Sequence, residues 1–227
     1  FGGDRELFAT ELILVSGDLF RGDTAFRPFD WRVKGTIAAN LNYLDVEENA
    51  IVNPDVRRGT DRTDEHVSLE EFFFEKKLAD LSPNYDFVSV RAGIQPFTSD
   101  FRGFLFSDLD LGVRLFGNFA SNRWQANLAF FERLEKDTNS GLNTFDTRDQ
   151  RVAIANVYRQ DFPRPGHTAS LSLHYLRDGP SFHFDENGFL ARPDPVGDFT
   201  PHEVEVVYIG YAGAGHVGRI NVDSALY

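Results

Sequence analysis

The sequence contains neither cysteine nor methionine in its 227 residues. Without cysteine the chain cannot form a disulfide framework, a thiolate metal site or an iron–sulfur site, and it has no cysteine nucleophile. It also lacks any run of about 18 apolar residues, the length that a transmembrane helix requires, so a helical membrane protein is excluded. Basic residues are in the minority, with 23 Lys and Arg against 35 Asp and Glu. We therefore expect no nucleic-acid partner, because phosphate binding needs clustered Lys and Arg.

Aromatic residues make up 14% of the chain, which argues against a disordered protein. The strongest pattern is an alternation of apolar and polar residues, as in 29–44, where Ile37, Leu41 and Tyr43 are separated by residues such as Asn40 and Asn42. This two-residue period predicts β-strands. The predicted strands are 6–20, 29–44, 67–79, 85–97, 109–119, 122–135, 150–162, 167–178, 202–212 and 216–227. No segment has the period of an amphipathic helix, so we predict an all-β fold.

The connections between the predicted strands are alternately short and long. The long ones are 45–66, 98–108, 136–149 and 179–201, and the short ones are 21–28, 80–84, 120–121, 163–166 and 213–215. A meander with short turns at one end and long loops at the other is typical of transmembrane β-barrels. Most of the predicted strands are also about twice as long as the 5 to 6 residues usual in soluble proteins. We therefore predict one domain, residues 1–227, that forms an antiparallel up-and-down transmembrane β-barrel with about ten strands visible.

A soluble β-protein would show the same alternation of apolar and polar residues, and it is the alternative to the membrane barrel. In a β-sandwich or a lipocalin-like barrel the apolar face of each strand turns inward to a core. Arginine residues in the middle of the polar faces, such as Arg91 and Arg114, suit a water-filled lumen, although a solvated sheet face would accept them too. The strand lengths and the systematic alternation of loop lengths favour the membrane barrel.

Three segments carry a family resemblance: LSPNYDFVSVRAGIQPFTSDFRGFLFSD (81–108), LGVRLFGN (111–118) and EKDTNSGLNTFDTRDQ (135–150). They resemble large porin-like outer-membrane β-barrel proteins of Gram-negative bacteria, and the resemblance runs through most of the chain. It implies a bacterial outer-membrane location, contact with outer-membrane lipid and lipopolysaccharide, and a pore-like or receptor-like role. It transfers no catalytic residue.

The C-terminus departs from that family. Outer-membrane barrels end on an aromatic residue preceded by apolar residues at every second position, whereas Tyr227 is preceded at that spacing by Ala225, Asp223, Asn221 and Arg219. Together with the start at Phe1, this leads us to expect a portion of a larger barrel, closed by further strands or by another chain.

Basic residues on the polar faces are the candidate lumen-lining set. They are Arg32, Lys34, Arg91, Arg114, Arg123, Arg133, Arg151 and Arg159. A ladder of cations in a wall of low dielectric constant favours anions. If these residues pair with acidic residues on neighbouring strands, they brace the wall instead, and the sequence leaves both possibilities open.

Other patterns point only weakly to chemistry. Ser172 and His174 share the polar face of one strand and could form a hydrolase triad with Asn156. However, Asn156 alternates in step with the apolar residues Val152 and Ile154, so it is expected on the apolar face of its strand. The acidic residues Asp185, Glu186 and Asp194 with His183 could bind calcium, yet their spacing fits no EF-hand loop. Three consecutive aromatics, 72–74, break the alternation and suggest a girdle, a bulge or a subunit contact. We expect no enzymatic activity, no metal and no cofactor.

The expected function is an outer-membrane channel or transporter for small polar solutes, anions included. A structural barrel that docks another protein is one alternative. The barrel part of an energy-coupled receptor is another, and it would need a plug domain.

Overall fold

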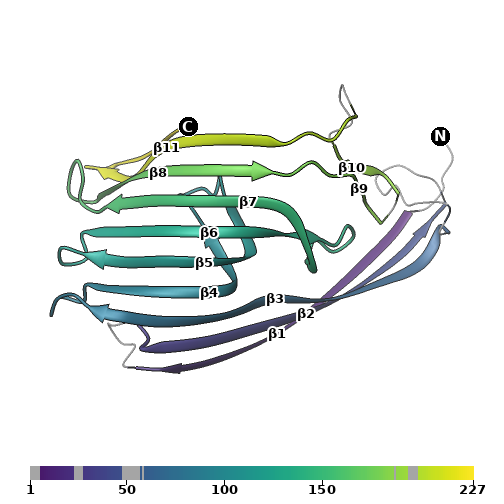
Figure 1. The fold of residues 1–227 in the computed structure, drawn as a ribbon, viewed down its shortest axis with the longest axis horizontal. Helices are drawn as coiled ribbons and strands as arrows, with labels where there is room; N and C mark the ends of the chain where they lie inside the picture. The colour runs from purple at the N-terminus through teal and green to yellow at the C-terminus, as the bar shows by residue number, and fades with distance from the viewer. Residues whose placement is uncertain (1–5, 23–27, 48–56, 58, 187, 194–198) are drawn as a thin grey trace.

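The computed structural model describes residues 6–22, 28–47, 57, 59–186, 188–193 and 199–227. These residues form one ten-stranded antiparallel sheet, in which β8 pairs with β11 and the other neighbours follow the chain order, and a separate β9–β10 hairpin (Figure 1). The strands are β1 (Glu6–Arg21), β2 (Trp31–Val46), β3 (Asp61–Asp80), β4 (Phe87–Thr98), β5 (Ser107–Phe119), β6 (Trp124–Lys136), β7 (Asn143–Arg159), β8 (His167–Asp178), β9 (His183–Phe184), β10 (Leu190–Arg192), β11 (Val204–Val217) and β12 (Ile220–Leu226). The sheet is not closed, and β1 and β12 are its two edges. No helix in the described part of the chain is long and apolar enough to cross a membrane.

All ten predicted strands are present, and two of them begin six or seven residues earlier than predicted. β3 begins at Asp61 and β7 at Asn143, because their polar first residues show no apolar alternation but still pair with β2 and β6. The β9–β10 hairpin, inside the longest loop, was not predicted. The predicted alternation of short and long connections was wrong at one point. The connection between β6 and β7 was predicted to be long, but because β7 begins early it comprises only 137–142 and is no longer than the next turn, 160–166.

The two faces of the sheet differ sharply in polarity, in the reverse of the pattern of a soluble sheet. On β8, Leu171 and Leu173 are 55% and 48% exposed, whereas Ser172 and His174 are 4% and 2% exposed. On β5, Leu111, Val113 and Leu115 are exposed, and Asp110 is fully buried. We call the face with the exposed apolar side chains the outer face and the opposite face the inner face.

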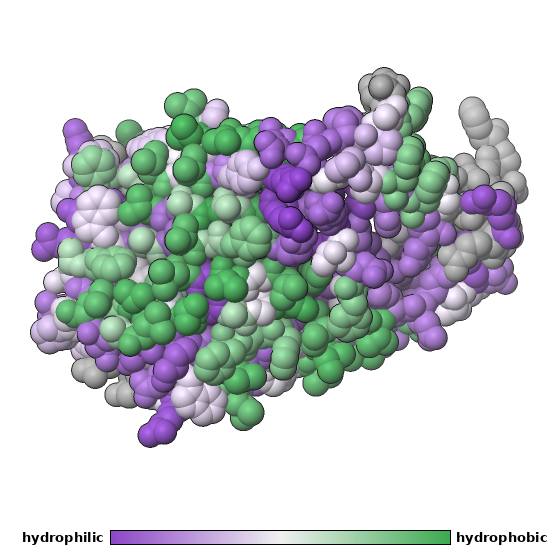
Figure 2. Space-filling model, viewed as in Figure 1, coloured by the Kyte–Doolittle hydropathy of each residue, from purple (hydrophilic) through white to green (hydrophobic). Residues whose placement is uncertain are grey.

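The outer face is apolar across the sheet. Its exposed members include Ile37, Leu41, Tyr43, Phe72, Phe74, Leu111, Val113, Leu115, Leu128, Phe130, Leu171, Leu173, Tyr175, Val207, Ile209 and Tyr211. In Figure 2 apolar residues cover the strands, and hydrophilic residues gather at the loop end on the right. The 72–74 run does not break the alternation, because Phe73 is buried on the inner face between the two exposed phenylalanines.

The inner face carries a small apolar core in its middle. Phe97, Phe106, Ala129, Phe131, Val152 and Ile154 form this buried cluster. Phe106 belongs to the β4–β5 loop, so the core lies between that loop and the inner face of β6 and β7. It is the one place among the described strands where buried apolar side chains gather as they do in a soluble protein.

The sheet curls strongly at its long-loop end. β4 pairs with β3 only from Phe72 onward, so the first part of β3 has β2 as its only partner strand in the described sheet. This part of β3 instead contacts the start of β7, although β4, β5 and β6 lie between them in strand order. In Figure 1, β1 to β3 slant past the ends of β4 and β5 toward the loop end of the molecule.

Candidate functional site: the inner face and its inward loop

A ladder of alternating arginine and phenylalanine side chains crosses the inner face from β2 to β5. In order it contains Arg32, Phe73, Arg91, Phe116, Arg114 and Phe97. The Arg91 guanidinium carbon lies 4.4 Å from the centre of the Phe73 ring and 5.6 Å from that of Phe116. That of Arg114 lies 4.4 Å from Phe116 and 4.9 Å from Phe97. Attraction between a cation and an aromatic ring face fixes these side chains in a stack.

The ladder forms because the strand register puts its members side by side. Arg32 is directly opposite Glu75, Glu75 is opposite Arg91, and Arg91 is opposite Arg114 on four successive strands. Two like charges opposite each other destabilise a sheet unless something compensates them. Here Glu75 lies 2.5 Å from Arg91, and the ring of Phe116 lies against both Arg91 and Arg114.

Most of the basic inner-face residues have a carboxylate partner. Asp18 pairs with Arg32 at 2.6 Å, and Glu71 pairs with Lys34 at 2.5 Å. These contacts match the bracing alternative, because each carboxylate cancels much of the field of its cation at a distance. Arg114 differs: within the described part of the chain its nearest polar partner is the side-chain oxygen of Asn127, 2.8 Å from Nε, and no carboxylate lies within ion-pair distance.

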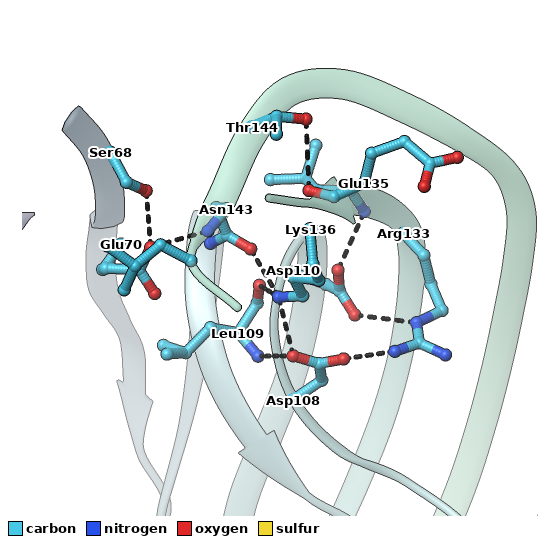
Figure 3. Close-up of polar contacts among 12 residues, drawn as sticks. Ser68, Glu70, Asp108, Leu109, Asp110, Arg133, Glu135, Lys136, Asn143 and Thr144 are labelled. Carbon is cyan, nitrogen blue, oxygen red and sulfur yellow. Dashed lines mark hydrogen bonds and ion pairs between the residues drawn. The ribbon is translucent and has the colours of Figure 1, made fainter. Parts of the chain in front are cut away.

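Arg133 belongs to a second polar group, the bridge cluster, at the long-loop end (Figure 3). The cluster comprises Ser68, Glu70, Asp108, Asp110, Arg133, Lys136 and Asn143. Arg133 pairs with Asp108 and lies 3.2 Å from Asp110, and Lys136 lies 2.8 Å from Asp108. Glu70 accepts the backbone N–H of Asn143 at 2.8 Å, which joins β3 to β7. The cluster therefore holds the curled end of the sheet together across three intervening strands.

The β4–β5 loop, residues 99–106, folds onto the inner face; we call it the inward loop. Asn156 and Tyr158 on β7 both donate hydrogen bonds to the carbonyl oxygen of Ser99, at 2.6 and 2.8 Å. On the other side, Arg102 pairs with Asp223 on β12 at 2.8 Å. The inward loop thus spans the concave side from β7 to the last strand.

Asp100 organises the turn of the inward loop. Its carboxylate accepts the backbone N–H groups of Arg102 at 2.8 Å, Gly103 at 2.5 Å and Phe104 at 3.3 Å, together with the hydroxyl of Tyr227 at 2.9 Å. Burial opposes the charged form of Asp100, but these hydrogen bonds outweigh it and the net effect lowers its pKa. Gly103 has φ +64°, and an added Cβ would lie 2.7 Å from the Cβ of Ser107, so the turn requires glycine there.

Several buried polar atoms on the inner face have no hydrogen-bond partner among the described protein groups. They include Ser89 Oγ, Gln95 Oε1, Ser99 Oγ and both ring nitrogens of His174. Buried polar groups are almost always satisfied by protein or by water. An inner face that carries such atoms is therefore suited to contact with water or a polar solute.

The structure separates the eight candidate lumen residues into two groups. Arg32, Lys34, Arg91, Arg114 and Arg133 lie on the inner face, as predicted from their polar parity. Their role in lining a lumen stays a prediction.

The inward placement of the other three was wrong. Arg123 lies exposed in the β5–β6 turn. Arg151 and Arg159 are on the outer face, where Arg151 pairs with Glu132 at 2.8 Å and Arg159 lies 4.8 Å from the Trp124 ring. The physical reason on β7 is that Val152 and Ile154 pack into the small inner core, so the alternate positions of this strand, which include Arg151 and Arg159, face outward.

The residues of the considered hydrolase triad lie on one face but not in a catalytic arrangement. Asn156 is directly opposite Ser172, on the inner face. The Ser172 hydroxyl donates to the carbonyl oxygen of Gly210 at 3.4 Å, and neither ring nitrogen of His174 has a hydrogen-bond partner among the described residues. A serine nucleophile needs a base within hydrogen-bond distance, and none is provided here within the described residues.

The acidic loop residues considered for calcium are only partly described. Asp194 lies outside the described residues, and His183 lies 3.9 Å from Glu135. Among the residues that are described, no group of three or more His, Asp or Glu is arranged to hold a metal ion.

Sequence reasoning did not identify which of the long loops folds inward, and it missed the phenylalanine members of the ladder. The alternation of Arg with Phe at two-residue spacing, as in Arg114 and Phe116, was a usable signal for the ladder. The choice of 99–106 as the loop that folds inward has no comparable signal, because the hydrogen bonds that anchor it are made to residues 57 to 127 positions later.

Comparison of the chain with protein-family models, with curated proteins and with solved structures finds no match.

Proposed function

We propose that this chain forms the wall of a transmembrane β-barrel of the bacterial outer membrane that passes small polar solutes. The reversed polarity of the two faces carries the proposal. Exposing a Leu, Ile or Phe side chain to water forgoes about 1.5–3 kcal/mol each, and large exposed apolar surfaces on soluble proteins are rare. In a bilayer the same residues are in contact with lipid chains, and the polar inner face is shielded from them.

The proposal accounts for the positions of the charged residues on the outer face. On β7, Arg151 lies toward the long-loop end and Arg159, stacked on Trp124, lies at the short-turn end. Exposed Leu128 and Phe130 lie on β6 between the levels of these two arginines. An apolar band with aromatic and basic residues at its margins is the pattern of a membrane-embedded barrel. The partners of this band are outer-membrane lipid and lipopolysaccharide.

A membrane-embedded sheet cannot keep open edges. The free N–H and C=O groups of an edge strand have no partner in lipid, at a cost of several kcal/mol each. We therefore propose that further strands, of the same protein or of a partner chain, pair with the free edges of β1 and β12. A barrel closed in this way has the inner face as its lumen.

The Arg–Phe ladder and the inward loop define the polar route in this barrel. Because Asp18, Glu71 and Glu75 neutralise their basic neighbours, the wall as a whole is not strongly anion-selective. Arg114 provides the local positive charge, beside Phe97 at the root of the inward loop. We propose general passage of small polar solutes, with a modest preference for anions at Arg114.

Single-channel recording in planar bilayers tests this function. The full-length protein should give discrete conductance steps, and Arg114→Leu should lower the permeability ratio of chloride to potassium. Arg123→Leu, in an exposed turn, is the matched control and should leave the ratio unchanged. Absence of any conductance from correctly assembled protein would contradict the channel proposal and favour a structural barrel.

A further inference from the structure

A groove of about 500 Å³ opens on the outer face at the short-turn end of the sheet. Most of its lining is apolar, with contributions from Trp124 of β6, Val157 of β7, Leu171 of β8, Tyr211 of β11 and Phe162 of the β7–β8 turn. The volume falls in the range of small-molecule sites. The groove is separate from the Arg–Phe ladder and the inward loop, which lie on the inner face.

The groove is hollow because two small residues lie side by side at this level of the sheet. Arg159, Ala169 and Gly213 are directly opposite one another on β7, β8 and β11. Two residues further from the turn, Leu171 and Tyr211 are opposite each other and are exposed. Ala169 is only 6% exposed, because larger side chains of the outer face surround it. The surface of the sheet is therefore lower beside Arg159 than at the next level.

Arg159 is the one charged residue among the described residues that line the groove. Its guanidinium carbon lies 4.8 Å from the centre of the Trp124 ring, and the register places the two residues directly opposite each other. Within the described chain no carboxylate lies within ion-pair distance of it, and Asp161, two residues later, accepts the backbone N–H of Gly166. A guanidinium group binds phosphate through two parallel hydrogen bonds. The groove thus combines an apolar lining with a cation that suits a phosphate.

A row of small side chains continues from the groove along the outer face of β7. Its members Ala153 and Ala155 are flanked on both neighbouring strands by larger apolar side chains. The flanking residues are Leu128 and Phe130 on β6 and Leu173 and Tyr175 on β8, all of them exposed. The outer surface between β6 and β8 is therefore lowest along β7, in line with Arg159.

This row has the length of one lipid leaflet. From Arg159 back to Ala153 the strand spans six residues, which at about 3.3 Å per residue is about 20 Å. With a strand tilt of about 40° this distance is about 15 Å along the membrane normal, half of a hydrocarbon thickness of about 30 Å. An acyl chain that begins at the level of Arg159 and follows the row ends near the middle of the bilayer.

We propose that the groove binds one phospholipid, with its phosphate on Arg159 and one acyl chain along Ala155 and Ala153. The inference rests on the membrane location in the proposed function and adds a defined lipid site to it. The short turns of outer-membrane barrels lie on the periplasmic side, and the leaflet on that side consists of phospholipids. Tryptophan is enriched at the level of the headgroups, which fits the position of Trp124 beside Arg159.

Native mass spectrometry of the full-length protein in detergent, titrated with dioleoylphosphatidylglycerol, tests the proposal. One lipid should bind more tightly than all later ones, and inorganic phosphate at the same concentration should not displace it. Arg159→Leu should weaken binding of this first lipid by about tenfold, because it removes charge-assisted hydrogen bonds to the phosphate. Arg151→Leu, on the same face of the same strand at the opposite end, is the matched control and should bind as the unmodified protein does.

Ala155→Phe keeps the test decisive if Arg159→Leu does not assemble. It fills the row with an apolar side chain and should weaken binding of the first lipid without a change in charge. The proposal is overturned if no lipid binds ahead of the others, if inorganic phosphate displaces it at equal concentration, or if Arg151→Leu weakens binding as much as Arg159→Leu. It is also overturned if either Arg159→Leu or Ala155→Phe, once assembled, leaves the affinity unchanged.

Two further outcomes separate this inference from other accounts of the groove. Dimers that form in place of the lipid complex and are lost in Arg159→Leu would assign the groove to a second copy of the chain and refute the lipid site. A protein that conducts ions in bilayers but holds no discrete lipid would also refute it, and would leave the proposed channel intact.

Discussion

The hydroxyl of Tyr227 donates a 2.9 Å hydrogen bond to the carboxylate of Asp100, which ties the C-terminal end of the chain to a loop 127 residues earlier. The ring of Phe104 also stacks on that of Tyr227, with 5.1 Å between ring centres. The inward loop is therefore held by β7 on one side and by the C-terminal residues on the other.

The hold of Asp100 on the inward loop should fail in acid. The pKa of Asp100 is lower in the folded protein than in the unfolded chain, where it is about 3.9. The stabilisation by its carboxylate is therefore complete above that unfolded-state pKa, and it is lost as the pH falls through the lower pKa of the folded state. A nitroxide attached at Leu105→Cys, in a chain without native cysteine, should be immobile at neutral pH and become mobile in acid.

Asp100→Asn is the matching variant, because an amide accepts fewer and weaker hydrogen bonds from the three N–H groups. Its label should be mobile at neutral pH and insensitive to acid. A label that stays immobile in both proteins down to about pH 2, well below the ordinary carboxyl range, would show that Asp100 does not control the loop.

Gly93→Ala should prevent the sheet from forming correctly. Gly93 has φ +127°, and an added Cβ would lie 2.1 Å from the carbonyl oxygen of Phe72 on β3. Backbone strain of this kind costs about 1–3 kcal/mol before the clash is counted. Gly17→Ala is the control, because nothing lies within 4 Å of its added Cβ. Urea unfolding of the protein in detergent should show a large loss of stability for Gly93→Ala and little for Gly17→Ala.

Glu70→Ala should loosen the curled end of the sheet. It removes the acceptor for the backbone N–H of Asn143 and leaves that buried donor without its partner, a loss of about 1–3 kcal/mol. Hydrogen exchange at Asn143 should become faster by one to two orders of magnitude, about 10 to 100-fold. Thr63→Ala, at an exposed position of the same strand, should leave that exchange rate unchanged. Equal rates in the unmodified protein and in both variants would show that the bridge cluster does not hold β3 to β7.

The sequence predicted what depends on local alternation. β8 has polar residues alternating with large apolar residues from Ser170 to Tyr175, and its bounds, 167–178, agree with the prediction. The facing of β7 was predicted wrongly because Val152 and Ile154 pack under the inward loop, and a pattern within one strand does not reveal what covers it.

The central claim is that the apolar outer face contacts lipid. The most direct test is a nitroxide scan of residues 170–175 on β8, one cysteine at a time, in the full-length protein reconstituted into bilayers. We predict high collision rates with oxygen, which dissolves in lipid, at Leu171, Leu173 and Tyr175, and low rates at Ser170, Ser172 and His174. High accessibility of the odd positions to a water-soluble nickel complex, or protection of those positions from both reagents, would contradict the account and place this sheet in a soluble protein.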